Sequence, residues 1–151
     1  MNMRKIIIAG SILFSLFIIA CSGKPKAEKQ GRSVEKTSAG VEKISRDTLA
    51  LSLGKGFVSG EVQKEERANK YFVFKTDGPG KLSAKLISQD TMANIRFTQI
   101  FFPDGSADGP FGRTLNYELE QAGTYTLSVG ENMMAGEPWT GSFTITVELE
   151  K

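Results

Sequence analysis

The sequence predicts an all-β fold, an antiparallel β-sandwich or jelly roll of about eight strands that follows a signal peptide and a disordered tether. Three observations predict it. From about residue 48 onward apolar and polar residues alternate, which is the pattern of strands that bury one face. Glycine, proline and aspartate turn signals separate these runs, and no helical period lies between them. Short regular strands without intervening helices favour an antiparallel sandwich over a parallel sheet.

The amino terminus has the organisation of a secretory signal. Arg4 and Lys5 precede fifteen uncharged residues, 6–20, which fall short of the about 20 apolar residues of a membrane span. This stretch ends in Ile-Ile-Ala directly before Cys21, which resembles the lipobox of bacterial lipoproteins. The resemblance implies cleavage before Cys21 and its acylation, which also accounts for the single unpaired cysteine. The alternative is an uncleaved signal anchor in which Cys21 is an incidental thiol.

Residues 21–46 are expected to form a lipidated, basic, disordered tether. Large apolar residues are almost absent, so the segment cannot bury a core. Seven basic residues face three acidic ones between positions 22 and 46, which leaves a net charge of −4 on residues 47–151. The basic excess either lies against anionic headgroups or is simply solvated. The binding domain is therefore expected to span residues 47–151.

Eight runs carry the strand pattern, in chain order 49–53, 57–62, 70–76, 82–86, 95–102, 115–119, 124–129 and 143–149. Between the second and the third, residues 63–69 are expected to form either one helical turn or a charged hairpin loop. Tyr125 follows Ala-Gly-Thr, as in the tyrosine corner of Greek-key sandwiches, where the hydroxyl bonds the backbone a few residues upstream. The alternative for Tyr125 is an ordinary core position.

The composition excludes several classes of protein. A chain of 151 residues without histidine has no Ser-His-Asp or Cys-His nucleophile system, and its one cysteine cannot form a disulfide framework. A formal charge of +2 is too small for a nucleic-acid binder. The pairs Glu65 with Glu66 and Glu118 with Glu120 are neighbours on a loop or strand, whereas glycoside hydrolysis needs carboxylates facing across about 5 to 10 Å. The protein is therefore expected not to be an enzyme, with a carboxylate-only hydrolase as the alternative.

Oxygen-bearing side chains at alternate positions before a glycine make a weak calcium candidate of Asp104, Ser106 and Asp108. They match the first half of an EF-hand loop, but the twelfth position, where a bidentate carboxylate belongs, is Leu115. The alternative is a polar hairpin loop that uses aspartate and glycine for turn geometry. No other cofactor is expected.

A turn-rich stretch before the last predicted strand holds two methionines and the only tryptophan. Met133, Met134 and Trp139 suit contact with a partner, because methionine and tryptophan are favoured at binding surfaces. Arg113, on the loop 103–114, is expected to join them if both loops leave the same end of the sandwich. The alternative is that Trp139 caps one end of the core and the methionines fill a gap.

Several segments together resemble the β-sandwich of bacterial pre-peptidase C-terminal domains and the family of periplasmic inhibitors of goose-type lysozyme: 57–62, 71–74, 109–111, 117–119, 123–129 and 143–147. The resemblance implies that loops at one end of the sandwich plug a lysozyme cleft, with basic residues in the loop before the last strand. The matching loop here, 130–141, departs from that pattern, because it carries Glu131 and Glu137 and no lysine or arginine.

These observations predict a lipid-anchored binding module of the bacterial cell envelope, on the outer membrane and facing the periplasm. Ser22 directly after Cys21 favours that membrane. The expected partner is a protein, with a lysozyme as the sharpest version, or a glycan, and no nucleic acid. The domain charge of −4 could steer a cationic lysozyme. The alternative is a structural or carbohydrate-binding envelope module without inhibitory activity.

Overall fold

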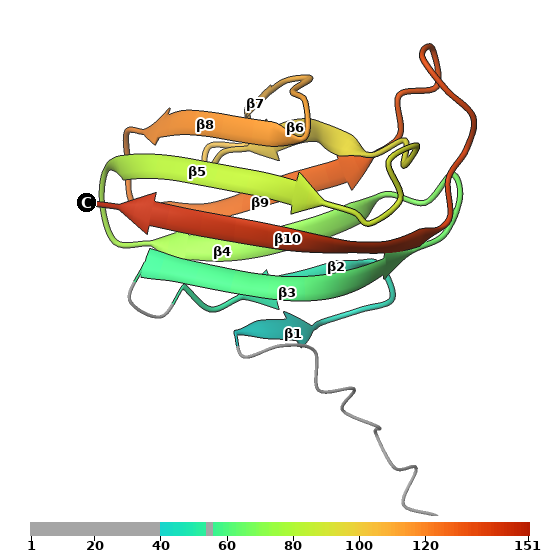
Figure 1. The fold of residues 1–151 in the computed structure, drawn as a ribbon. Coiled ribbons are helices and arrows are strands. Elements are labelled where there is room, and N and C mark those ends of the chain that lie inside the picture. The colour runs from blue at the N-terminus through green and yellow to red at the C-terminus, as the bar shows by residue number, and fades with distance from the viewer. Residues whose placement is uncertain (1–39, 54–55) are drawn as a thin grey trace, which may run out of the picture. The chain divides into compact units, whose positions relative to one another are not determined.

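The computed structural model describes residues 40–53 and 56–151, which form two stacked β-sheets (Figure 1). The six-stranded sheet has the order β1-β2-β4-β9-β6-β7, and the four-stranded sheet has the order β3-β10-β5-β8. Among the described strands, only β2 and β4 pair in parallel, and the other neighbours are antiparallel. The predicted all-β sandwich is confirmed. The strands are β1 (Val41–Lys43), β2 (Thr48–Leu51), β3 (Phe57–Lys64), β4 (Lys70–Thr76), β5 (Gly80–Ile87), β6 (Arg96–Phe101), β7 (Ala107–Asp108), β8 (Thr114–Leu119), β9 (Gly123–Gly130) and β10 (Gly141–Glu150).

Each of the eight predicted runs contains a strand, and the structure adds two short edge strands. Strand β1 lies inside the segment expected to be tether, where it pairs with β2 and buries Val41. Strand β7 lies inside a predicted loop and pairs with the end of β6. Residues 65–69 form neither a helical turn nor a hairpin, because they carry the chain from the four-stranded sheet to the six-stranded one. The predicted signal peptide, Cys21 and the tether up to residue 39 lie outside the described residues.

None of the described residues forms a helix long and apolar enough to cross a membrane.

Inward-facing apolar side chains from both sheets fill the space between them. Phe72 of β4 meets Phe143 of β10 edge-on with ring centres 6.3 Å apart, which joins the two sheets across the core. Phe74 stacks on Tyr125 at 5.6 Å. The Tyr125 hydroxyl donates a hydrogen bond of 2.9 Å to the backbone carbonyl of Gln121, four residues upstream. The bond predicted for a tyrosine corner is therefore present.

The register of β6 against β9 decides which loops share an end of the sandwich. Arg96 at the start of β6 pairs with Gly130 at the end of β9, so the loop after Gly130 leaves beside the start of β6. The turn that follows β6 lies at the other end, where Pro103 packs against Gly123 at the start of β9. The eight residues of β9 separate these ends by about 23 Å, at about 3.3 Å per residue.

Candidate functional site

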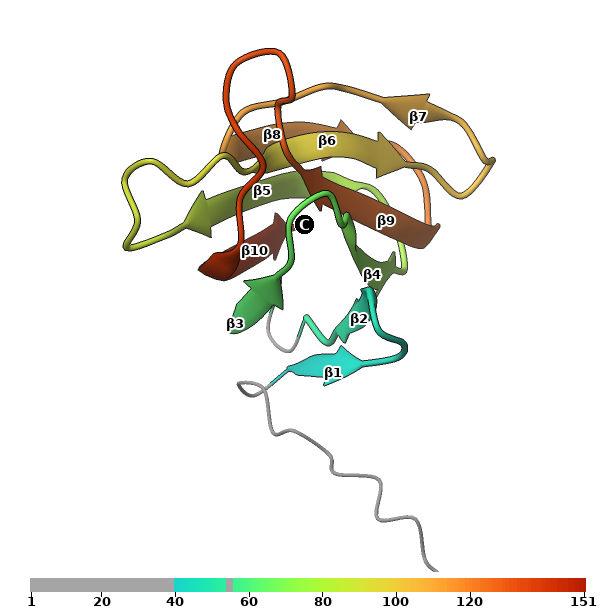
Figure 2. The ribbon, with the colours of Figure 1, turned by 90° about the vertical axis from the view of Figure 1, so that its right-hand side faces the viewer.

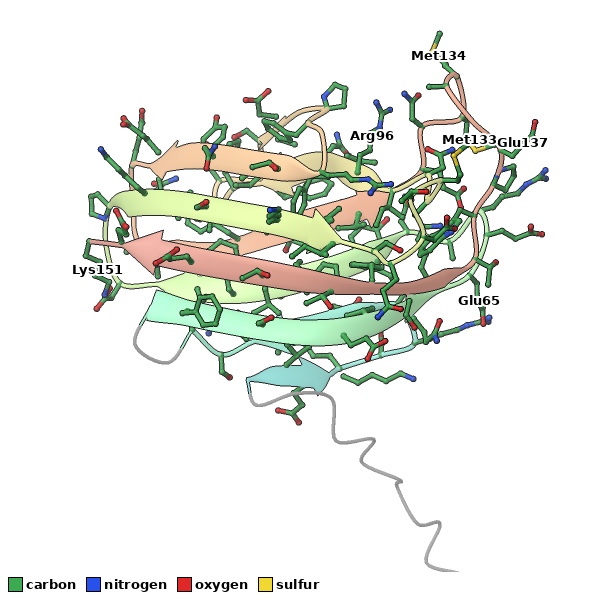
Figure 3. The ribbon with its side chains drawn as sticks, viewed as in Figure 1. Glu65, Arg96, Met133, Met134, Glu137 and Lys151 are labelled. Atoms are coloured by element: carbon green, nitrogen blue, oxygen red, sulfur yellow. The ribbon has the colours of Figure 1, made fainter. Side chains whose placement is uncertain are left out.

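Residues 131–140, which connect β9 to β10, project beyond the end of the two sheets (Figures 1 and 2). We call this segment the 131–140 loop. Met134 at its tip is 98% exposed, and Met133 is 56% exposed. Figure 3 shows Met134 at the top of the loop, with Met133 and the exposed Glu137 lower down. The tip therefore presents thioether side chains that do not contribute to the core.

A buried ion pair fixes the base of the 131–140 loop. The Lys64 ammonium at the end of β3 lies 2.5 Å from Oε1 of Glu131, and the two side chains are 0% and 4% exposed. The same ammonium donates to the backbone carbonyls of Glu65 and Trp139, at 2.9 and 3.5 Å. Two buried charges are stable only when paired and hydrogen-bonded, so this pair ties the loop to the end of β3.

The carboxylate of Glu131 also gathers backbone donors from two loops. The Arg67 amide donates to both of its oxygens at 3.1 Å, and the Trp139 amide donates to Oε1 at 3.0 Å. Arg67 holds a left-handed conformation, with φ of +57°, that a non-glycine residue rarely adopts. Burial by itself would raise the pKa of Glu131, but the hydrogen bonds from Lys64, Trp139 and Arg67 outweigh it and lower that pKa below its ordinary value. Glu131 is therefore ionised at neutral pH.

Asn94, in the connection between β5 and β6, clamps the 131–140 loop from the opposite side. Its amide nitrogen donates to the carbonyls of Asn132 at 3.2 Å and Glu137 at 2.9 Å, which lie on the two arms of the loop. Its amide oxygen accepts from the Asn132 backbone N–H at 2.9 Å. Both arms are thus held by one side chain, while the tip between them stays exposed.

Trp139 lies in the last part of the loop and is only 9% exposed. Its ring packs against Gly141, and its indole N–H donates to Oδ2 of Asp90 at 2.7 Å. That hydrogen bond, together with one from the Met92 backbone, lowers the pKa of Asp90. The structure therefore places Trp139 at the end of the core, whereas its assignment as a contact residue stays a prediction.

Arg113 lies at the same end as the 131–140 loop, and the turn after β6 does not. The guanidinium of Arg113 donates to the Ala93 carbonyl, and the Arg113 carbonyl accepts from the Leu86 amide. Asp104 lies in the turn at the far end, about the length of β9 away. The expected single surface therefore includes the last residues of the 103–114 loop and excludes its tip.

The calcium candidate forms a compact turn. Oδ1 of Asp104 accepts from the Ser106 amide at 2.9 Å and from the Ser106 hydroxyl at 2.6 Å, while Asp108 accepts from the Gly109 amide at 2.7 Å. These bonds are the local pattern that aspartate uses to close turns. Within the described part of the chain, no group of three or more acidic, cysteine or histidine side chains gathers in a way that could hold a metal ion.

The sequence did not single out Lys64, Asn94 or Asp90 as residues that hold the loop. Only for Lys64 does the sequence pattern indicate such a role. In β3 the inward positions alternate with outward ones, and Lys64 falls on the inward set together with Val58 and Val62. A charge on the inward face of a strand indicates a buried partner. The partner itself, 67 residues away, could not be read from the pattern.

No family model matches the sequence, and no curated protein matches it either. The fold is similar to that of PliG from Aeromonas hydrophila, a periplasmic lysozyme inhibitor of g-type lysozyme. The TM-score is 0.56 at 13% sequence identity, over 68% of this chain and 96% of that chain. The resemblance to such inhibitors expected from the sequence is confirmed at the level of the fold.

Two further solved structures match with lower TM-scores. PliG from Salmonella Typhimurium gives a TM-score of 0.49 at 11% identity, over 69% of this chain and 99% of that chain. The pre-peptidase C-terminal domain of collagenase from Bacillus anthracis gives 0.44 at 9% identity, over 69% of this chain and 93% of that chain.

Proposed function

We propose that this chain is a binding module of the bacterial cell envelope, and that its 131–140 loop enters the cleft of a protein partner of the goose-type lysozyme class. The observation that carries the proposal is a loop held at its base and on both arms while Met134 at its tip is 98% exposed. A loop already fixed in one conformation loses little entropy on binding, so more of its contact energy appears as affinity. The shared fold with an inhibitor of g-type lysozyme supports the choice of partner.

Charge supports the same partner class. Residues 47–151 carry a net charge of −4, and the 131–140 loop has Glu137 exposed and no basic residue. A cationic lysozyme would be attracted to the domain as a whole, with a larger effect on the rate of association than on affinity. Met133 and Met134 are the proposed contacts on the loop, with Trp139 and Arg113 beside them.

The test is inhibition of cell-wall lysis by a goose-type lysozyme, using the purified full-length chain. We expect inhibition by the wild type and a loss of affinity of roughly thirtyfold, or about 2 kcal/mol, for Met134→Ala. A matched assay with a lysozyme of another class measures specificity. Full lytic activity at a large molar excess of the wild-type chain would reject the lysozyme version of the proposal.

The proposed location is the outer membrane, facing the periplasm, with Cys21 acylated and residues 22–39 acting as the tether. Mass spectrometry of the chain purified from membranes tests this directly. We expect a peptide that begins at Cys21 and carries acyl chains. An unmodified Cys21, or a chain that still contains residues 1–20, would reject the proposal of a lipid anchor.

A glycan-binding module is the second candidate, and a hollow at the same end of the sandwich favours it. The hollow has a volume of about 430 Å³, and polar side chains suited to hydroxyl groups dominate its wall: Glu61, Ser88, Gln89, Asp90, Thr140, Ser142 and Thr144. Sedimentation with purified peptidoglycan separates the candidates. The second function would be favoured if the wild type binds peptidoglycan without inhibiting lysis. Gln89→Ala and Thr144→Ala should then abolish that binding.

A further inference from the structure

Exposed apolar side chains gather at the end of the sandwich that carries the 131–140 loop. Six large hydrophobic residues are exposed in the described part of the chain, and only Phe57 lies at the other end. Ile44 lies in the turn between β1 and β2. The remaining four lie on or beside two neighbouring loops: Ile87, Met92, Met133 and Met134. Ile87 is the last residue of β5, and Met92 lies in the connection that follows it, residues 88–95. We call this connection the 88–95 loop. A second loop therefore presents the same kind of side chain as the first.

Met92 is exposed although its backbone is fixed. Its side chain is 84% exposed, while its amide donates to Oδ1 of Asp90 at 2.8 Å. The other oxygen of Asp90 accepts the indole N–H of Trp139 at 2.7 Å, so one carboxylate joins the turn that carries Met92 to the 131–140 loop. The next residue, Ala93, is buried, and its carbonyl accepts from Arg113. Met92 thus stands on a rigid turn without a packing role in the fold.

The two loops are also joined by Asn94. Its three hydrogen bonds reach Asn132 and Glu137, so the position of the 131–140 loop depends on the 88–95 loop. With the Asp90–Trp139 bond, these contacts make the two loops one unit.

We infer that Met92 is a second contact residue, so that the binding surface is the pair of loops, 88–95 and 131–140. This inference rests on the proposed function and extends it to a loop that the sequence did not single out. The partner surface that fits is concave and apolar with a cationic rim, since methionine adapts to irregular apolar surfaces and the exposed charged residues of the two loops, Asp90 and Glu137, are both acidic. The cleft of the proposed lysozyme partner is the occupant to which the inference commits.

The test is titration calorimetry of a goose-type lysozyme against the full-length chain and four variants, one of them a control. Met92→Ser and Met134→Ser should each weaken binding by at least about tenfold, because each replaces an apolar contact with a polar group. Met92→Leu should restore most of the affinity, since it keeps the apolar volume. Phe57→Ser is the matched control, because Phe57 is 49% exposed at the far end of β3 and pairs with Glu148. Thermal unfolding of each variant verifies that the fold is retained.

The outcomes separate the inference from the proposed function. If the wild type binds, Met134→Ser weakens binding and Met92→Ser behaves like Phe57→Ser, the inference is overturned and the proposed function stands. If Met92→Leu recovers the affinity, Met92 makes an apolar contact. If Met92→Leu loses as much affinity as Met92→Ser, the contact proposed for Met92 is ruled out. If the wild type does not bind, the proposed function fails and the inference falls with it.

Discussion

Replacing Lys64 by methionine removes one half of the buried pair and leaves the Glu131 carboxylate without its cation. Methionine fills a similar volume, so the change tests charge rather than packing. Glu131 retains the Arg67 and Trp139 amides as donors, but its side chain is only 4% exposed and water cannot replace the ammonium. We therefore expect Lys64→Met to destabilise the fold and to loosen the 131–140 loop.

The expected loss in the free energy of unfolding is about 3 to 5 kcal/mol at pH 7, the usual cost of removing one partner from a buried ion pair. For a domain of roughly 110 residues this corresponds to a fall in Tm of about 12 to 20 °C, at about 4 °C per kcal/mol. The double variant Lys64→Met with Glu131→Gln should recover a large part of the loss. The carboxamide is neutral and still offers an oxygen to the two backbone amides. Denaturant unfolding followed by tryptophan fluorescence measures all three proteins.

The destabilisation should also depend on pH. The folded pKa of Glu131 lies below its ordinary value of 4.5, so the stability from its ionised form is complete above about pH 4.5 and is lost as the pH falls through the lower folded pKa. In Lys64→Met, protonation of Glu131 relieves the unpaired charge. The difference in stability between wild type and variant should therefore shrink as the pH is lowered from 7, and it should continue to shrink below about pH 4.5. A loss below about 1 kcal/mol at pH 7, or no recovery in the double variant, would refute the argument that a dry ion pair holds the loop.

Four further predictions concern the core and the loop. Tyr125→Phe, which removes the hydrogen bond to Gln121, should cost about 1 kcal/mol in a denaturant titration. Gly123→Ala should cost about 1 kcal/mol or more in the same measurement, because φ is +146° and the new Cβ would lie 2.5 Å from a side-chain carbon of Pro103. Trp139→Ala should cost about 3 to 5 kcal/mol as a buried aromatic truncation, while the fully exposed Met134→Ala should leave Tm within about 2 °C of the wild type in thermal unfolding.

Alternation along the chain was sufficient to predict the sandwich. Runs such as residues 143–149 carry apolar residues at every second position, and these positions are the inward face of β10. The two strands that were missed are short and lie at sheet edges, where few residues are buried. In β1 only Val41 points into the core, so no period could be detected. Edge strands of this kind form because a neighbour offers hydrogen bonds, which is a property of the assembled sheet.

The exposed residues of the 131–140 loop could be picked out from the sequence, but the residues that hold the loop in place could not. Met133 and Met134 were found because large apolar residues in a turn-rich segment are unusual. Asn94 was missed because an asparagine between two strands ordinarily indicates a turn, and its bonds to Asn132 and Glu137 span 38 and 43 residues. The sequence left Trp139 open between surface and core. The structure shows its ring packed against Gly141 with only 9% of the residue exposed.

The position of the final strand has a consequence for the order in which the domain can form. Strand β10 (Gly141–Glu150) lies between β3 and β5. These two strands have no hydrogen bonds to each other in the described sheet. A nascent chain that lacks these residues can pair β5 with β8, but β3 has no neighbour to join in its own sheet. Contacts between residues so distant in sequence also make β-sandwiches slow to fold. The four-stranded sheet is therefore completed only after β10 has been synthesised, and until then the backbone edges of β3 and β5 that face β10 remain unpaired.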